Sequence, residues 1–391
     1  MTQVLPPRSR VFHIGPQKTG TTALQMAAAA RRSQLLDHGV YYPGASTTVS
    51  HRYEVAALVG KAVGWKTPDS KPPPRRLWDQ LVDEVRARPE RVLISHEYAA
   101  GATTQTVIEV AQTFGADLQV LITLRSLSAL LPSVWQETNK GAGNRSTFDR
   151  WLRQVLDDGT EVHQIIRRRH DQGTLIRRWS DVVGPDRVTV IMLNPDDHSF
   201  LFHSVEQLLG LPPELLNGAN DAAAHAANRT LTVPEVELFR RFNKAFRAAD
   251  TSWSDYDRLG LHGSIPRVLG HRAPPSDEPR LTMPDWAADR ADQWSEHNAA
   301  AVAGSGVRVI GDVAWLALPA KRRRGPEEDH RRVTEVPIDL AVEAMLGISA
   351  AAMGREPDFR VANDPSRQFN RFTARELGAE LYRRGIKRLR R

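Results

Sequence analysis

The segment from Val11 to Thr22, which reads VFHIGPQKTGTT, constrains the fold of this chain more than any other. A short apolar run predicts a strand, a glycine-bounded turn follows, and an alanine-rich stretch up to Arg32 predicts a helix. Gly15 and Gly20 let the backbone turn tightly and come close to a bound group. A strand, turn and helix in this order direct backbone N–H groups and the positive end of the helix dipole at one point. The segment therefore predicts an anion site, and a phosphate suits it.

Further apolar runs predict a parallel sheet. Helical patterns separate these runs, and strands that alternate with helices favour an α/β fold with a doubly wound parallel sheet and flanking helices. Ligands of such sheets bind beyond the carboxyl ends of the strands, here residues 15–22, 95–98 and 124–126. The predicted strands are 11–15, 40–42, 91–95, 118–124 and 188–193, and the predicted helices are 21–38, 75–88, 104–114, 165–183 and 199–209.

Composition suggests one large domain with a basic extension. The chain has 391 residues, of which 41% are apolar, and its net charge is +7. Residues 321–391 hold 17 Lys or Arg against 11 Asp or Glu, so most of the excess charge lies there. We predict a catalytic domain over 1–320 and a partly helical basic extension over 321–391, which is amphipathic from Thr373 and suited to acidic surfaces. The proline-rich stretch 260–284 predicts a surface excursion.

The sequence also predicts a cytoplasmic protein. The chain has no cysteine, so it forms no disulfide and offers no thiolate for a metal or for catalysis. The N-terminus lacks the apolar core of a secretory signal, and no apolar window is long enough to predict a transmembrane segment. No His, Asp and Glu cluster has the spacing of a metal site, and we predict none.

The glycine-bounded turn carries one lysine and three threonines. Lys18 can neutralise phosphate charge, and the threonine hydroxyls add donors beside the backbone N–H groups. A Walker A loop places its lysine directly after the last glycine, whereas here Lys18 stands two residues before Gly20. The candidate cofactor-binding residues of the turn are Gly15, Gln17, Lys18, Thr19, Gly20, Thr21 and Thr22.

This order of lysine, glycine and two threonines resembles the 5′-phosphosulfate loop of sulfotransferases that use PAPS (3′-phosphoadenosine 5′-phosphosulfate). A second motif supports the resemblance, because in that family an arginine ends a strand and a serine follows eight residues later to bind the 3′-phosphate. Arg125 and Ser133 match this spacing, with Ser126 as a good helix N-cap. An arginine fork suits a phosphate dianion, and a helix-borne hydroxyl adds a donor. Pro132 is expected to kink this helix.

A third element, RVLISHEY, lies at residues 91–98. The family places a Glu or His after this strand, and bacterial members that resemble this chain often show Ser-x-Glu, which matches Ser95-His96-Glu97. Transfer to a hydroxyl gains from a base near the attacking oxygen. We predict Glu97 as this base, with His96 second. The two are adjacent, so on an extended strand they point to opposite faces.

The resemblance covers residues 8–195 by motif and identifies the chain as similar to bacterial PAPS-dependent sulfotransferases, whose core resembles that of P-loop nucleoside triphosphatases. It implies in-line sulfuryl transfer from PAPS to a hydroxyl or amine of a carbohydrate, a glycolipid or another small metabolite, with PAP (adenosine 3′,5′-bisphosphate) as product and no metal required. Lys18 would stabilise charge on the leaving phosphate, as an electrostatic catalyst. His51, Trp135 and Glu137 are weaker candidates for the acceptor pocket, and Arg229 for a phosphate contact.

Two alternatives stay open at this stage. A kinase that uses ATP usually needs an Asp at a strand end to hold Mg²⁺, whereas the strand ends here offer Glu97 and Arg125. A non-catalytic protein that binds nucleic acid or membrane would use the basic extension. The core, however, lacks basic stretches interleaved with aromatic residues.

Overall fold

The structure of the protein is a computed structural model. It describes residues 3–45, 48–65, 70–141, 146–156, 161–217, 229–249, 251–320 and 333–355.

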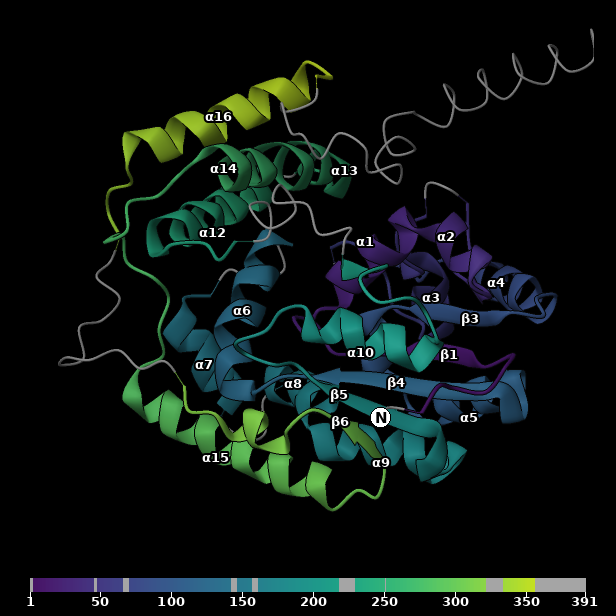
Figure 1. The fold of residues 1–391 in the computed structure, drawn as a ribbon. Coiled ribbons are helices and arrows are strands. Elements are labelled where there is room, and N and C mark those ends of the chain that lie inside the picture. The colour runs from purple at the N-terminus through teal and green to yellow at the C-terminus, as the bar shows by residue number, and fades with distance from the viewer. Residues whose placement is uncertain are drawn as a thin grey trace, which may run out of the picture.

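A six-stranded sheet forms the centre of the molecule, and all its strand pairs are parallel (Figure 1). Its order is β2-β3-β1-β4-β5-β6. This confirms the predicted doubly wound α/β fold and its five strands. The sixth strand, β6, was not predicted, because it is only three residues long and half-buried. The strands are β1 (Arg10–His13), β2 (Val40–Tyr41), β3 (Arg91–Ser95), β4 (Leu118–Leu124), β5 (Val188–Met192) and β6 (Arg308–Ile310).

Helices cover both faces of the sheet because the central strands are apolar on both sides. In β1, Phe12 belongs to one core and Val11 to the other, as the alternation of side chains along a strand requires. The first core includes α3 (Arg52–Leu58), α4 (Arg76–Arg86), α5 (Thr104–Phe114) and α9 (Gln172–Val183). The second includes α1 (Thr21–Ala30), α2 (Arg32–Asp37) and α10 (Phe200–Leu209).

Two predicted helices are each divided into two. Residues 21–38 form α1 and α2, which meet at Arg31. Within 165–183, α8 (Glu161–His170) ends before Asp171, whose side chain accepts a hydrogen bond from the Thr174 N–H and so caps α9. A capping side chain inside a continuous helical pattern marks a helix boundary that periodicity alone does not reveal.

A helical region with its own core lies beside the sheet. It contains α6 (Leu127–Lys140), α7 (Phe148–Leu156), α12 (Val233–Ala248), α13 (Trp253–Tyr256), a π-helix labelled η5 (Asp257–Ser264), α14 (Ile265–His271), α15 (Asp285–Ala303) and α16 (Ile338–Ala352). Shorter 3-10 helices complete the described fold: η1 (Glu97–Gly101), η2 (Gly115–Asp117), η3 (Pro185–Arg187) and η6 (Val313–Ala317).

The prediction of a surface excursion over 260–284 was wrong for its first half, which is helical as η5 and α14. A glycine of this stretch, Gly263, is a contact point between helices. A Cβ at Gly263 would lie 2.9 Å from the Gly347 carbonyl oxygen, and one at Gly347 would lie 2.6 Å from that of Gly263. Two helix backbones approach this closely only where both residues lack a side chain.

The predicted division at residue 320 falls next to residues 321–332, which lie outside the described part of the chain. Beyond them, α16 packs against η5 and α14 and covers the helical region in Figure 1. Residues 356–391, with the amphipathic stretch from Thr373, are also outside it, so the amphipathic part of the extension and its contacts stay predictions. Within the described residues, no helix combines the length and apolarity needed to cross a membrane.

Candidate functional site

The predicted strand, turn and helix around residue 15 are present. Strand β1 ends at His13, the turn occupies 14–20, and α1 begins at Thr21. Lys18 and Gly20 have φ angles of 67° and 79°, so the turn uses left-handed backbone twice in three residues. Gly20 is the N-cap of α1, and no described side chain caps it. The first N–H groups of α1 therefore stay available to a ligand, at the positive end of the helix dipole.

Gly15 is required by the close approach of strand β4. A Cβ at this position would lie 1.9 Å from Thr123 Oγ1 and 3.1 Å from His13 Nε2. Both neighbours are fully buried side chains that cannot move aside. The backbone at Gly15 is thus held against the sheet.

A buried polar network under the turn was missed by sequence reasoning. His13 Nδ1 lies 2.8 Å from Ser95 Oγ, and His13 Nε2 lies 3.1 Å from Thr123 Oγ1. Gln25 Nε2 donates to Ser95 Oγ at 3.2 Å. Burial lowers the pKa of His13 to about 3, so the imidazole is neutral. These residues connect the ends of β1, β3 and β4 by hydrogen bonds without adding charge. The sequence signal that could have indicated this network was the polar residue within each apolar strand.

The three predicted threonines have different surroundings. Thr19 Oγ1 donates to the Pro16 carbonyl at 2.6 Å and lies 2.9 Å from Thr123 Oγ1, so its hydroxyl supports the turn. Thr21 is buried, with only long contacts of 3.4 Å to two turn carbonyls. Thr22 is exposed, while Gln17 is half-buried. Thr21 and Thr22 are therefore the hydroxyls with donor capacity left for a ligand.

Lys18 forms an ion pair with Glu137 from α6. Lys18 Nζ lies 2.7 Å from Glu137 Oε2, and Lys140 Nζ lies 3.9 Å from the same oxygen. Burial acts to raise the pKa of Glu137, but the two lysines outweigh it and lower this pKa on balance. Burial lowers the pKa of Lys140 to about 8. The structure thus brings Glu137 to the predicted phosphate loop, where two cations share one carboxylate.

Arg125 follows β4 and has a half-buried side chain. Its carbonyl oxygen accepts a hydrogen bond from Gln172 Nε2 at 2.7 Å, but its guanidinium has no hydrogen bond or ion pair within the described residues. Burial lowers the pKa of Arg125. Ser133, eight residues on, is half-buried in α6, the helix that also contains Pro132. An arginine without a counter-charge in a partly desolvated place is costly, and an anion would compensate it.

The segment after β3 places His96 and Glu97 at the start of η1 (Glu97–Gly101). His96 Nδ1 accepts a hydrogen bond from the Tyr98 N–H at 3.2 Å, and His96 Nε2 lies 3.5 Å from Glu97 Oε2. Burial lowers the pKa of His96 to about 3. Burial also raises the pKa of Glu97, although the charges of Arg52 and Lys61 oppose this effect. The sheet edge therefore presents a neutral histidine beside a carboxylate that binds its proton more readily than usual.

His51 and Trp135, predicted for the acceptor pocket, lie in the interior. His51 Nδ1 accepts a hydrogen bond from the Ser95 N–H at 3.1 Å, and burial lowers the pKa of His51 to about 4. The Trp135 ring is packed against Phe148, with centroids 5.1 Å apart, in the core of the helical region. Both side chains contact neighbouring core residues, and their role at the acceptor stays a prediction.

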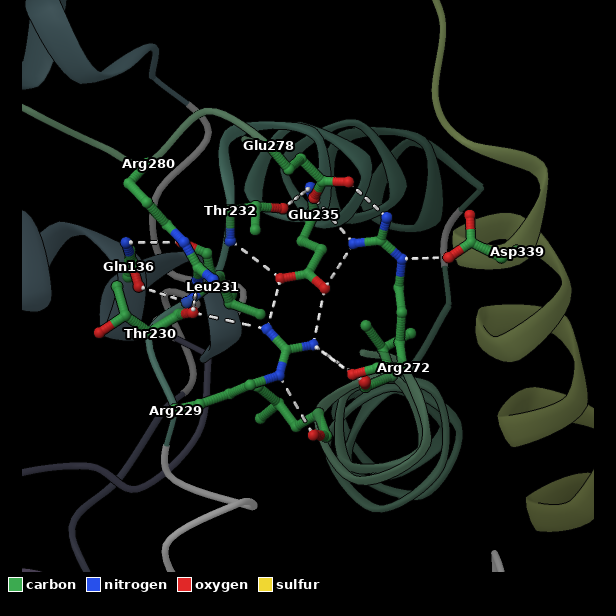
Figure 2. Close-up of polar contacts among 12 residues, drawn as sticks. Gln136, Arg229, Thr230, Leu231, Thr232, Glu235, Arg272, Glu278, Arg280 and Asp339 are labelled. Atoms are coloured by element: carbon green, nitrogen blue, oxygen red, sulfur yellow. Dashed lines mark hydrogen bonds and ion pairs between the residues drawn. The ribbon is translucent and has the colours of Figure 1, made fainter. Parts of the chain in front are cut away.

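Arg229, a weaker phosphate candidate, is occupied by protein partners (Figure 2). Its guanidinium donates to both oxygens of Glu235 at 2.7 Å and to the carbonyls of Leu269 and Val268. Arg272 also donates to Glu235. This arrangement leaves no donor of Arg229 for a ligand and locks α12 to α14.

In the described residues, no three His, Cys, Asp or Glu side chains come together in a way that could hold a metal ion.

Comparison with solved structures gives a structural similarity. Among solved structures, the chain is similar to a crystal structure of a sulfotransferase from Alicyclobacillus acidocaldarius. The two share 16% identity, the match covers 69% of this chain and 98% of that one, and the TM-score is 0.36. No protein-family profile and no curated protein matches this chain. Similarity at this level establishes neither a family nor an activity.

Proposed function

We propose that this protein is a sulfotransferase that moves a sulfuryl group from PAPS to a hydroxyl or amine of a carbohydrate, a glycolipid or another small metabolite. One observation carries the proposal. The turn 15–22 follows β1, and the unpaired guanidinium of Arg125 follows β4, the strand hydrogen-bonded to β1. The chain passes from β1 to β2 and β3 on one side of β1, and then crosses to β4 on the other side. The carboxyl ends of β1 and β4 are therefore the switch point where such sheets bind ligands.

The residues present fit the two charged ends of PAPS. The turn, closed against the sheet at Gly15, offers backbone N–H groups, Lys18 and the hydroxyls of Thr21 and Thr22 to the 5′-phosphosulfate. Arg125 and Ser133 would take the 3′-phosphate, since neither side chain has a hydrogen-bond partner in the described chain. When bound, PAPS supplies a sulfuryl group activated as a mixed anhydride with phosphate.

Glu97 is the better placed of the two candidate bases. Because His96 Nδ1 accepts a hydrogen bond and the ring is neutral, its proton sits on Nε2, the nitrogen nearest Glu97. That nitrogen donates and cannot take a proton. Glu97 has a raised pKa, which improves a carboxylate as a general base. As the acceptor oxygen bonds to sulfur and the bond from sulfur to the phosphate oxygen breaks, Glu97 takes the acceptor proton and PAP leaves.

Lys18 contributes electrostatically. Its ammonium lies 2.7 Å from the Glu137 carboxylate, which keeps it beside the turn, and a phosphosulfate in the turn would replace this partner. A cation at the phosphate oxygen stabilises the negative charge that develops there as the bond to sulfur breaks.

Other features support a bacterial, cytoplasmic enzyme over the two alternatives. The lysine and glycine order is not that of Walker A, and Arg125 stands at a strand end where an ATP-dependent kinase would need a carboxylate for Mg²⁺. A protein that only binds nucleic acid through its basic extension would leave the proposed PAPS site unused. The cysteine-free composition fits a reducing compartment.

Calorimetric titration with PAP, ADP and ATP–Mg²⁺ tests the proposal. We expect a clear preference for PAP that is lost in Arg125→Ala, because only PAP carries a 3′-phosphate. A preference for ATP–Mg²⁺ would favour the kinase, and strong salt-dependent binding of DNA without nucleotide binding would favour the basic binder. In an assay with PAPS, an unchanged rate of sulfuryl transfer in Lys18→Ala would refute the role of Lys18.

A further inference from the structure

Three cationic side chains gather around Glu97 and Tyr98 without belonging to the proposed PAPS site. Arg52 opens α3, Lys61 follows α3, and Arg169 lies near the end of α8. Both α3 and α8 contact η1, the short helix that carries Glu97 and Tyr98. Residues from two helices on either side of η1 thus place positive charge at the candidate base.

Direct contacts fix each of these cations. Lys61 Nζ lies 3.4 Å from the centroid of the Tyr98 ring, a cation–π contact. Arg52 hydrogen-bonds the Tyr98 side chain. A Cβ at Gly101 would lie 3.5 Å from Arg169 Nε, so the Arg169 guanidinium lies over the end of η1.

Glu97 is the carboxylate whose electrostatic interaction with these cations is resolved. Glu97 faces all three cations, while the nearby Glu137 is already paired with Lys18, and His96 is neutral. Arg169 has no hydrogen bond or ion pair within the described residues. Burial lowers the pKa of Arg169, and Arg168 lowers it further by like-charge repulsion. Glu97 acts on this guanidinium only at a distance, so its N–H groups are partly buried without a hydrogen-bonded anion, which is costly, and a bound anion would remove that cost.

We propose that Arg169, Lys61 and Arg52 form an anion subsite for the acceptor, so that the acceptor carries a carboxylate, sulfate ester or phosphate ester near the hydroxyl that is sulfated. This inference rests on the proposed function. The turn 15–22 and Arg125 already account for both charged ends of PAPS, so the anion that Arg169 would bind is a second one, with Lys61 and Arg52 beside it. Charged hydrogen bonds from arginine orient such a group beside Glu97.

Binding of inorganic phosphate to the PAP-saturated protein tests the subsite, because PAP then fills the cofactor's own anion sites. We expect phosphate to bind the wild type and Arg168→Met alike, and about tenfold more weakly to Arg169→Met, as the loss of a charge-assisted hydrogen bond predicts. Arg168 is the matched control, since it is exposed and next to Arg169. The affinity for PAP should stay unchanged in Arg169→Met, and this also shows that the variant is folded.

Each other outcome has a distinct meaning. Equal phosphate affinity in Arg169→Met and Arg168→Met would overturn the subsite. Phosphate binding that depends on Arg169 without PAP but vanishes when PAP is bound would assign these cations to the cofactor and overturn the acceptor subsite. If PAP binds to none of the proteins, the proposed function fails, while the phosphate titration without PAP still decides whether Arg169 holds an anion.

Discussion

Arg272 in the helical region and Arg125 at the carboxyl ends of the sheet strands differ in how their positive charge is balanced. Arg272 has a side chain that is 1% exposed, and it donates to Glu235, Glu278 and Asp339 (Figure 2). Arg125 at the end of β4 is half-buried and has no counter-charge in the described chain. Hydrogen bonds to carboxylates raise the pKa of Arg272, whereas burial lowers that of Arg125.

The buried carboxylates of the two regions differ in the same way. Burial acts to raise the pKa of Glu235, but Arg229 and Arg272 outweigh it and lower this pKa. At the sheet edge burial prevails, and the pKa of Glu97 is raised. The helical region therefore pairs the charges of Arg229, Arg272 and Glu235 within the protein. At the carboxyl ends of the strands Lys18 also has a partner, Glu137, but Arg125 has none among the described residues, and we propose that a ligand supplies it. Variants of the first region should lower stability, and variants of the second should lower binding or rate.

The largest expected effect concerns Glu97. Glu97→Gln should lower kcat about 100- to 10,000-fold, because a general base is lost. In the wild type the rate should rise with pH as Glu97 loses its proton, with a midpoint above the ordinary value of 4.5 since its pKa is raised. Rate measurements with PAPS over a pH series check this. Glu235→Gln is the matched control, and an equal loss of kcat there would break the comparison.

Next in size is the stability effect of Arg272. Arg272→Met should lower the free energy of unfolding by about 3–5 kcal/mol, because it leaves buried carboxylates without their counter-charge. The affinity for PAP should not change. Urea denaturation measures this, with Arg258→Met as control, since that arginine is 53% exposed and its pair with Asp255 contributes little. A loss as small as that of the control would show that the cluster is not a structural lock.

The counterpart is Arg125. Arg125→Met should leave the free energy of unfolding within about 1 kcal/mol of the wild type or raise it, because no described residue loses a hydrogen bond or ion pair to this side chain. PAP affinity should fall about 10- to 100-fold, which corresponds to the loss of one or two charged hydrogen bonds. Denaturation and PAP titration on the same preparation check both values. Destabilisation as large as in Arg272→Met would mean that Arg125 has a structural role.

The smallest effect is expected for Glu137. Its pair with Lys18 is about one-third exposed and should contribute less than about 1 kcal/mol. Glu137→Gln should therefore barely change stability. PAP should bind about two- to fivefold more tightly, because in this variant Lys18 has no ion pair to break before it contacts the ligand. Weaker PAP binding would show instead that the carboxylate positions Lys18 for the ligand.

The sequence was a good guide wherever a pattern is local. Five strands and the turn at 15–22 follow from apolar runs and glycine spacing, because buried parallel strands leave continuous apolar segments. The kind of site stays a prediction, which rests on Lys18 and Arg125 at predicted strand ends. Hydrogen bonds across strands have no such signature, so the His13 network stayed hidden. The contact between Gly263 and Gly347 was missed for the same reason, as it joins residues far apart in sequence.

The sequence by itself determined a doubly wound sheet, because hydrophobic periodicity acts over a few residues, and it predicted an anion site at the carboxyl ends of the strands. Only the tertiary structure decided which charged side chains form ion pairs within the protein. The sequence offers Arg125 as the main phosphate ligand and Arg229 as a weaker one, and only the structure shows that Glu235 occupies Arg229 while no described carboxylate reaches Arg125. Pairing depends on distance in space and on burial, and the packing of separate elements sets both.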